Sequence, residues 1–316
     1  MNGRPPAASS PTESVRAALL LTNRLVGLDA KPLPAGEFWQ LVERVDPAEL
    51  LELDLAGIVD LLGCAPVEAV RYRTLLDAST ALMFEQERLL EGGVTLVSAL
   101  DDRFPAALRE RLASACPPFL LVAGALESLG RPALGVVGSR DGAPEALEVA
   151  RDAARMAVGR GWSLVSGLAR GVDQAAMAAA IEVGGHAVGI PADGILQASR
   201  NAEVRRSVHD GHLCLASPFA PSAPFRAGNA IGRNKIIYAL SQVTFVAAAD
   251  KGSGGTWSGA SEAIERGFAH VAVWTGAGAK AGNAALVAHG ATPVVDVSVL
   301  FDLDPKIPTA AQDSLF

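Results

Sequence analysis

Residues 134–150, "LGVVGSRDGAPEALEVA", run from a short stretch of small apolar residues through Gly-Ser-Arg into a segment with helical periodicity. Residues 163–176, "SLVSGLARGVDQAA", repeat the pattern, with two glycines, a serine and an arginine where an apolar strand meets its helix. Strands that end in glycine-rich turns and lead into helices are the units of parallel α/β sheets. The two stretches therefore predict strands of one sheet, whose following loops lie at its ligand-binding edge.

The alternation of short apolar runs and helical stretches continues along the chain from Val94. It predicts an α/β fold in which a mainly parallel sheet carries helices on both faces. The strands are expected at 94–98, 119–124, 134–138, 163–167, 186–191, 212–217, 243–249, 270–274 and 292–297, and the helices at 142–160, 171–184, 199–210, 229–240, 257–267 and 281–289.

Residues 14–92 have a different texture, because apolar residues recur every three or four positions and Pro or Gly separates the segments. This pattern predicts a small all-helical domain in front of the α/β domain. We therefore expect a disordered, Pro-rich leader (1–13), a helical domain (14–93), the α/β domain (94–300) and a mobile C-terminal tail (301–316).

Composition narrows the class of protein. Apolar residues make up 50% of the chain and charged residues 19%, the balance of an ordinary soluble globular protein. The first apolar run is short and carries Arg16 and Arg24, so we expect no signal peptide or membrane span and a cytoplasmic location. The three cysteines, Cys64, Cys116 and Cys214, are scattered without a CxxC pattern, which predicts buried, reduced thiols and no metal site.

The net charge of −7 is unevenly distributed along the chain. Residues 1–132 hold 12 Lys and Arg against 18 Asp and Glu, whereas residues 133–300 hold 14 against 13. The acidity therefore lies outside the segment with the glycine-rich turns. Basic residues near those turns can still attract an anion, although no broad basic face is indicated.

The two glycine-rich turns have the composition of phosphate sites. A helix N-terminus after such a turn offers free backbone N–H groups and the positive end of a dipole, and Arg can grip a phosphate through two oxygens. Either turn alone is equally consistent with a tight strand-to-helix connection. The chain has neither a GxGxxG nor a GxxxxGK[ST] motif, so no dinucleotide or ATP cofactor is expected. The candidate residues are Gly138, Ser139, Arg140, Ser166, Gly167, Arg170 and Gly171.

Two later stretches extend the set of candidates. Residues 225–242, "FRAGNAIGRNKIIYALSQ", place three cations and an amide at or near a helix start, and residues 249–267, "ADKGSGGTWSGASEAIERG", repeat the strand, Gly/Ser/Thr loop and helix pattern. If these stretches are functional, each adds a contact to an anion. If they are structural, the first is a solvent-exposed helix start and the second a connecting loop. The residues concerned are Arg226, Arg233, Asn234, Lys235, Ser253, Gly254, Gly255 and Thr256.

With these four motifs in this order, the chain resembles the DNA-processing protein A (DprA/Smf) family. The resemblance covers about two thirds of the chain, and the order and spacing of four motifs are far more specific than any one of them. The motifs read "VVGSR" (136–140), "SGLARGVD" (166–173), "GRNKII" (232–237) and "SGGTWSGA" (253–260). The resemblance implies a Rossmann-like domain that binds single-stranded DNA, protects it and helps to load a RecA-type recombinase in transformation and recombination, acting as a homodimer without enzymatic activity.

Residue by residue, the resemblance implies that Gly138, Ser139 and Arg140 hold the DNA backbone. It also implies that Gly167, Ala169 and Gly171 shape the adjoining turn and that Arg233, Asn234 and Lys235 match the family's RNR-like segment. This chain departs from the family pattern at several places. Met177 stands where the family has His, and residues 194–204, "GILQASRNAEV", lack its Tyr-Pro pair and hence a candidate stacking ring. The family's "LLSE" has become "CLASP" (214–218), and a strand that usually ends in Val-Glu-Ala ends in "FVAAAD" (245–250).

Other interpretations stay open at this point. The loop at 253–260 faintly resembles that of cytokinin-activating phosphoribohydrolases. The alternative function is therefore a nucleotide-sensing or nucleotide-hydrolysing module, in which Glu262 would stabilise positive charge on the ribose. Phe225 or Trp257 could stack on a base, but core packing is the commoner role of such rings. Asp173 is expected to stabilise its helix dipole. A protein-docking role for the acidic helical domain is the third possibility.

Overall fold

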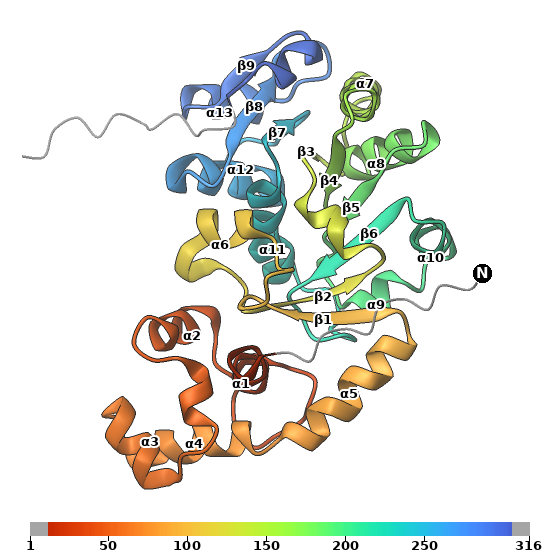
Figure 1. Cartoon of the computed structure of the whole chain (residues 1–316). Coiled ribbons are helices and arrows are strands. Elements are labelled where there is room, and N and C mark those ends of the chain that lie inside the picture. The colour runs from red at the N-terminus through yellow and green to blue at the C-terminus, as the bar shows by residue number, and fades with distance from the viewer. Residues whose placement is uncertain (1–11, 305–316) are drawn as a thin grey trace, which may run out of the picture.

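The computed structural model describes residues 12–304, and across them the strands form a nine-stranded sheet (Figure 1). The strands are β1 (Val94–Ser98), β2 (Phe119–Ala123), β3 (Ala133–Val137), β4 (Ser163–Ser166), β5 (Ala187–Gly189), β6 (Leu213–Ser217), β7 (Val243–Val246), β8 (His270–Trp274) and β9 (Thr292–Val294). Their order in the sheet is β1-β2-β6-β5-β4-β3-β7-β8-β9. All neighbours from β6 to β9 run parallel, whereas β2 is antiparallel to both β1 and β6. The prediction of a mainly parallel sheet is confirmed.

Helices cover both faces of the sheet, as predicted (Figure 1). One face carries α7 (Pro144–Gly159), α8 (Val172–Glu182), α9 (Ile195–Ala198) and α10 (Ala202–His209), and the other carries α6 (Ala106–Leu112), α11 (Ala227–Leu240), α12 (Gly254–Arg266) and α13 (Ala281–Ala288). Buried alanines such as Ala150, Ala153, Ala176 and Ala180 let α7 and α8 lie close to each other and to the strands. This close packing brings the first turn of α8 beside the loop after β3.

The direction in which the sheet grows reverses between β3 and β7. From β3 the chain adds strands outward to β6, and it then returns to the other side of β3 for β7, β8 and β9. Parallel sheets bind ligands in the crevice that such a reversal leaves beyond the strand carboxyl ends. The Ser139 N–H donates to the carbonyl of Ala248 at 2.8 Å, which joins the two loops across this point.

The N-terminal helical region packs under the edge strand β1 (Figure 1). It consists of α1 (Glu13–Thr22), α2 (Ala35–Val42), α3 (Leu55–Leu62), α4 (Pro66–Leu76) and α5 (Ser79–Glu91). Its buried side chains, Leu20 and Phe38 among them, belong to the same apolar cluster as Leu96 of β1. The indole N–H of Trp39 also donates to the carbonyl of Cys116 at 2.8 Å. A domain boundary near residue 93 therefore stays a prediction.

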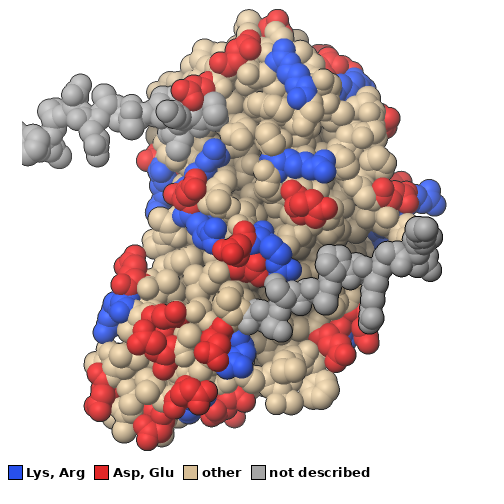
Figure 2. Space-filling view, in the orientation of Figure 1, with Lys and Arg blue, Asp and Glu red and all other residues tan. Residues whose placement is uncertain are grey.

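Acidic side chains gather over this helical region at the lower left of Figure 2, while the face above it mixes both signs. The distribution agrees with the counts along the sequence. It leaves the α/β part as the part of the surface where an anion meets less repulsion.

Most of the predicted leader and tail falls on residues 1–11 and 305–316, outside the described residues. At the predicted boundaries themselves, Glu13 opens α1, and Phe301 closes a 3₁₀ helix, η4 (Val297–Phe301). The Phe301 ring packs edge-on against Trp162, with 5.3 Å between ring centroids. Residues 13 and 301 therefore belong to helices rather than to the predicted leader and tail.

Within residues 12–304, no helix is long and apolar enough to cross a membrane. Cys116 and Cys214 are buried, and this burial raises the pKa of both thiols to about 12. Cys64 is only half-buried, so the prediction of a buried thiol is not met there.

Candidate functional site

A cavity of about 480 Å³, here called the switch cavity, lies where the sheet reverses direction between β3 and β7. It brings together residues from all four sequence motifs, which are separated by up to 121 positions along the chain, from 137 to 258. The predicted residues that line it are Gly138, Ser139, Arg140, Ala169, Arg233, Asn234, Ser253, Gly254, Gly255 and Thr256.

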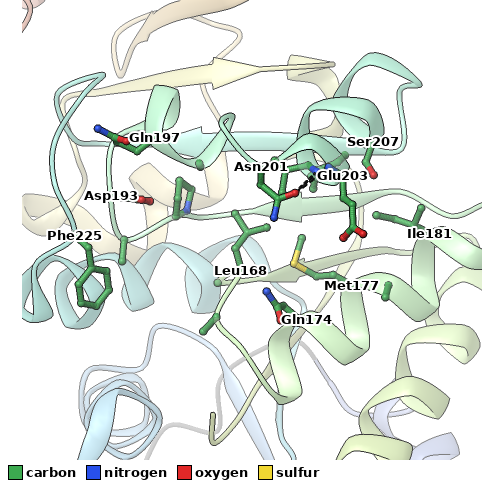
Figure 3. A pocket seen from close by; sticks show the side chains of 18 of the residues that line it. Leu168, Gln174, Met177, Ile181, Asp193, Gln197, Asn201, Glu203, Ser207 and Phe225 are labelled. Carbon is green, nitrogen blue, oxygen red and sulfur yellow. Dashed lines mark hydrogen bonds between the residues drawn. The ribbon is translucent and has the colours of Figure 1, made fainter.

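A larger cavity of about 820 Å³, here called the side cavity, adjoins it between α8 and the segment that contains α9 and α10. Leu168 and Met177 point into its middle from the loop after β4 and from α8 (Figure 3). The two cavities share a wall. The residues that line both are Arg140, Ala169, Phe225 and Arg233.

Two helices begin at the switch cavity with no side-chain cap on their N-termini, α11 and α12. α12 starts at Gly254, three residues earlier than predicted, so Gly254, Gly255 and Thr256 form its first turn instead of a loop. First-turn N–H groups have no partner within their own helix, and the helix dipole makes this end positive. The geometry suits a bound phosphate or another anion.

Arg140 stands exposed at the mouth of both cavities. Its guanidinium carbon lies 5.5 Å from the centroid of the Phe225 ring, a cation–π distance. The Phe225 side chain is itself 53% exposed, so the pair presents a cation and an aromatic face to solvent. Both groups are accessible to a ligand, so Phe225 does not take the core-packing role that is commoner for such rings.

A buried carboxylate and a buried guanidinium hold the turn after β4. The N–H of Gly167 donates to Asp173 Oδ2 at 3.1 Å, and Arg233 Nη2 donates to the Gly167 carbonyl at 2.7 Å. Burial raises the pKa of Asp173, while Arg233 and backbone N–H groups oppose the rise. The same burial lowers the pKa of Arg233. Both side chains, 4% and 5% exposed, therefore act on the shape of the site.

Glycine is required at two positions of this turn. A Cβ on Gly167 would lie 1.9 Å from Arg233 Nη1, inside the guanidinium. Gly171 has φ +81°, and a Cβ there would lie 2.6 Å from the carbonyl oxygens of Ser139 and Arg140. The first turn of α8 can therefore approach the β3 loop only with glycine at 171, which agrees with a turn-shaping role.

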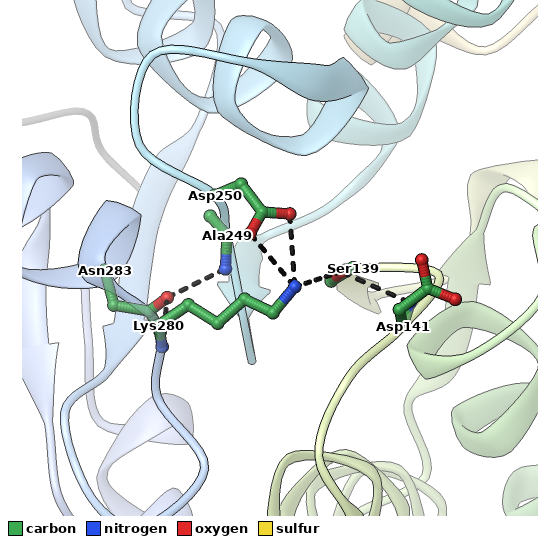
Figure 4. Close-up of polar contacts among 6 residues, drawn as sticks. All are labelled: Ser139, Asp141, Ala249, Asp250, Lys280 and Asn283. Atoms are coloured by element: carbon green, nitrogen blue, oxygen red, sulfur yellow. Dashed lines mark hydrogen bonds and ion pairs between the residues drawn. The ribbon is translucent and has the colours of Figure 1, made fainter.

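Lys280 is a further cation of the site that sequence reasoning missed (Figure 4). Its Nζ donates to Ser139 Oγ at 2.8 Å and to Asp250 Oδ1 at 3.0 Å, so it joins the β3 loop to the β7 loop. Beside it, Asn283 accepts the Ala249 N–H at 2.8 Å. Lys280 lies outside the four motifs, and its position after β8, one strand from the reversal, was the available signal.

Asn234 connects the two helices that begin at the switch cavity. Its Nδ2 donates to the carbonyl of Gly255 at 2.8 Å, and a Cβ on Gly259 would lie 2.9 Å from the same nitrogen. The amide therefore fixes the first turn of α12 against α11. Like Arg233, it orders the walls of the cavity from a mostly buried position.

The remaining predicted residues lie elsewhere. Ser166 is buried, and its Oγ donates to the carbonyl of Val136 on the neighbouring strand β3 at 2.6 Å. Lys235 lines a third, smaller cavity of about 210 Å³ on another side of α11, where burial lowers its pKa. Arg170, Arg226 and Glu262 are absent from the lining of the three cavities described here, and Glu262 faces Arg266 at 3.7 Å.

Trp257 packs partly buried against the core and does not line either cavity. Of the two candidate stacking rings, the structure therefore places Phe225 alone at the site. Among residues 12–304, no cluster of His, Cys, Asp and Glu has the arrangement of a metal site.

Comparison with protein families and sequences gives a consistent result. Residues 95–303 match the family described as DNA recombination-mediator protein A. The chain is 31% identical over 211 residues to the DNA processing protein DprA of Streptococcus pneumoniae, an alignment that covers 64% of this chain and 70% of that protein. It is 34% identical over 140 residues to protein Smf of Escherichia coli, covering 44% of this chain and 37% of that protein.

Solved structures agree in fold. The X-ray structure of DNA processing protein A from S. pneumoniae matches with a TM-score of 0.68 at 23% identity, over 86% of this chain and 98% of that one. The protein of the same name from Helicobacter pylori, in a structure concerned with its single-stranded DNA binding mode, matches with a TM-score of 0.56 at 19% identity, over 66% and 94%. The first match extends beyond the α/β part into the helical region.

Proposed function

This chain belongs to the DNA recombination-mediator protein A (DprA/Smf) family, and from that membership we propose that it binds single-stranded DNA in the switch cavity. The H. pylori relative is described as a single-stranded DNA binder. Phosphates of the strand would lie against the first turns of α11 and α12, with Arg140 gripping one of them from the mouth.

The observation that carries the proposal is the convergence of four separate motifs on one cavity with two uncapped helix N-termini. A purely structural set of turns has no need to leave N–H groups and an exposed Arg around a common hollow. Arg140 and the buried Arg233 are the cations of its lining, which also holds the carboxylates of Asp141, Asp173 and Asp250. The helix N-termini and the exposed Arg140, and not the net charge of the walls, therefore favour an anion there.

The wider role that we propose is protection of single-stranded DNA and loading of a RecA-type recombinase onto it, by a homodimer in the cytoplasm. In this role the protein binds DNA and catalyses no reaction on it. Family membership supports it, and the dimer is tested directly by light scattering of the purified chain. A monomeric mass at micromolar concentration would contradict that part.

The central experiment measures fluorescence anisotropy of a labelled single strand and of a duplex of equal length, at about 50 and 200 mM salt. The single strand should bind more tightly, because bases in a duplex hold the backbone too stiffly to follow a narrow cavity. Its affinity should fall steeply with salt as phosphate contacts release counterions. Equal affinity for both forms, or an affinity independent of salt, would refute the proposal.

A further inference from the structure

We propose that the side cavity receives an unstacked nucleobase from the strand whose phosphates lie in the switch cavity. The inference rests on the proposed single-stranded DNA binding and assigns a different part of the nucleotide to each cavity. A nucleotide joins its base to its phosphate through one sugar, so this division requires the two cavities to be contiguous.

The shared wall satisfies that requirement. Arg140, Phe225 and Arg233 border both cavities, and the exposed ring of Phe225 stands at the passage between them. Arg233 also has a buried Nε with no hydrogen-bond partner in the described chain. The passage thus offers an aromatic face and cations to the sugar-phosphate portion of a nucleotide on its way from one cavity to the other.

The interior of the side cavity suits the flat face of a base. Its apolar lining comes from Leu168, Met177, Ile181, Val204 and Leu213. Its volume of about 820 Å³ lies within the range of pockets that hold drug-sized molecules, so a base has ample room. Bases bind to apolar and aromatic surfaces without regard to sequence, because every base has such a face.

The polar groups of the side cavity can hydrogen-bond to the edge of a base. Three carboxylates, those of Glu182, Asp193 and Glu203, line it together with three cations, those of Arg140, Arg206 and Arg233. The carboxylates can accept hydrogen bonds from the exocyclic amines of bases. Gln174 and Gln197, which also line the cavity, offer both donors and acceptors to a base edge (Figure 3).

The backbone directs one apolar side chain into this space. Leu168 has φ +59°, a left-handed conformation that residues other than glycine rarely adopt. The hydrogen bonds from Arg233 and to Asp173 fix the preceding peptide, and the Leu168 side chain rests on the bare backbone of Gly189, where a Cβ would lie 2.8 Å from its Cδ1. Such outliers persist where the surroundings enforce them, often at ligand sites.

The side cavity is also where this sequence departs from the family pattern. Met177, in place of the usual His, lines it, and so do Gln197 and Asn201 from the segment that lacks the Tyr-Pro pair. Both departures change the surface that a base would meet. The preference among bases is therefore expected to be particular to this chain.

The test compares two labelled oligonucleotides of equal length on the full chain: oligodeoxythymidine and a strand of abasic sites with the same number of phosphates. The wild type should bind the base-bearing strand at least about fivefold more tightly, the lower end of the range for stacking one base. Ala178→Trp, at an exposed position of α8 that lines the side cavity, should remove most of this preference and leave the abasic strand unaffected. Ala106→Trp, at an exposed position of α6 away from both cavities, should change neither affinity.

Leu168→Gly provides a second variant, in which relief of the φ +59° strain offsets part of the packing that is lost with the side chain. It should lower the affinity for the base-bearing strand while the affinity for the abasic strand is maintained. Equal affinity of the wild type for both strands overturns the base pocket but leaves the proposed function intact. Binding of neither strand overturns both. Displacement of oligodeoxythymidine by an equal concentration of deoxythymidine monophosphate also overturns the inference, because the cavity would then serve free nucleotides.

Discussion

Arg140 is a residue whose substitution is expected to change DNA binding but not the stability of the fold. Its side chain is exposed, its contact with Phe225 is a weak cation–π pair, and the neighbouring Ser139 and Gly171 shape the loop through their backbone groups. An exposed cation of this kind adds little to folding. The fold therefore gives no reason for a cation at the mouth of the switch cavity, whereas the proposed DNA binding does.

Arg140→Ala should weaken single-strand binding by about 1–3 kcal/mol, the range for a hydrogen bond to a charged group. Arg140→Lys should recover only part of the loss, because an ammonium cannot grip two phosphate oxygens in one plane. Removal of one phosphate contact should also lower the salt slope by roughly one unit. Anisotropy titrations at several salt concentrations measure both effects.

Arg131→Ala is the matched control, since Arg131 is also exposed but precedes β3 at the opposite end of the strand. It removes the same charge and should leave binding nearly unchanged. Intact binding in Arg140→Ala together with a large fall in melting temperature would identify Arg140 as a structural residue.

Substitution of Gly167, in contrast, is expected to lower the stability of the fold. Gly167→Ala places a methyl group within the Arg233 guanidinium, so Arg233 must leave the Gly167 carbonyl and lose its place beside Asp173. We expect a loss of about 2–4 kcal/mol in the free energy of unfolding, from overpacking and an uncompensated buried charge. Urea denaturation followed by circular dichroism measures it.

Gly159→Ala is the control for that substitution. Gly159 ends α7, and a Cβ there would meet nothing within 4 Å. Alanine should therefore stabilise the protein slightly, by up to about 1 kcal/mol, because it restricts the unfolded chain and favours a helix. A loss of stability comparable to that of Gly167→Ala would show that contact with Arg233 is not the cause.

At the level of elements, every predicted strand of the sheet is present, because short apolar runs between glycine-rich turns are a strong local signal. Helix faces are harder to assign. Asn234 and Lys235 are consecutive, yet the rotation of about 100° per helical residue sends one to the switch cavity and the other to the third cavity. A sequence motif names both residues and gives no register for the helix.

Asn283 shows how an element outside the motifs supports the site. From α13 it accepts the Ala249 N–H, and its Nδ2 donates to the carbonyls of Ala247 and Trp274 at 3.0 and 2.7 Å. Local sequence holds no trace of these contacts, because they join the ends of β7 and β8 to a helix that follows later. Lys280 escaped prediction for the same reason.

Asn283→Asp should destabilise the protein by about 2–4 kcal/mol, although the shape is unchanged. Asp cannot donate to the two carbonyls, and its charge is buried against them. Burial against two carbonyls should raise the pKa of the new carboxyl above that of an unfolded Asp, so thermal denaturation should show the deficit shrinking as the pH falls from neutral toward about 4, where the protonated carboxyl can donate to one of the carbonyls.

Asn201→Asp serves as the control for the same chemical change. Asn201 caps the N-terminus of α10 by accepting the N–H groups of Glu203 and Val204, and Asp is an equally good cap. It should alter stability by less than about 0.5 kcal/mol. A similar effect at both positions would mean that the donor bonds of Asn283 contribute little.

At the level of the whole molecule, the helical region and the sheet share one apolar cluster. Side chains of α1 and α2 lie in it together with those of β1 and α8. The sequence predicted the helical segments but not this common core, because amphipathic periodicity shows that a face is buried and not what buries it.

We expect thermal unfolding of the full chain to occur in a single calorimetric transition, since separating the two parts would expose the shared core. Near-ultraviolet circular dichroism should report the same midpoint, as Trp39 lies between the parts. Two resolved transitions, the first of them leaving the sheet folded, would instead support an independent helical domain at 14–93.

The position of β2 between β1 and β6 has a consequence for synthesis. β1 and β2, an antiparallel pair connected through α6, leave the ribosome well before their neighbour β6. Roughly ninety residues separate the end of β2 at Ala123 from the start of β6 at Leu213, and domains fold as the chain emerges. During that interval one edge of β2 has free N–H and carbonyl groups and no partner within the chain. Open edges of this kind recruit strands from other molecules. Nascent chains that stop short of β6 are thus the form of this protein most exposed to strand exchange and to capture by chaperones.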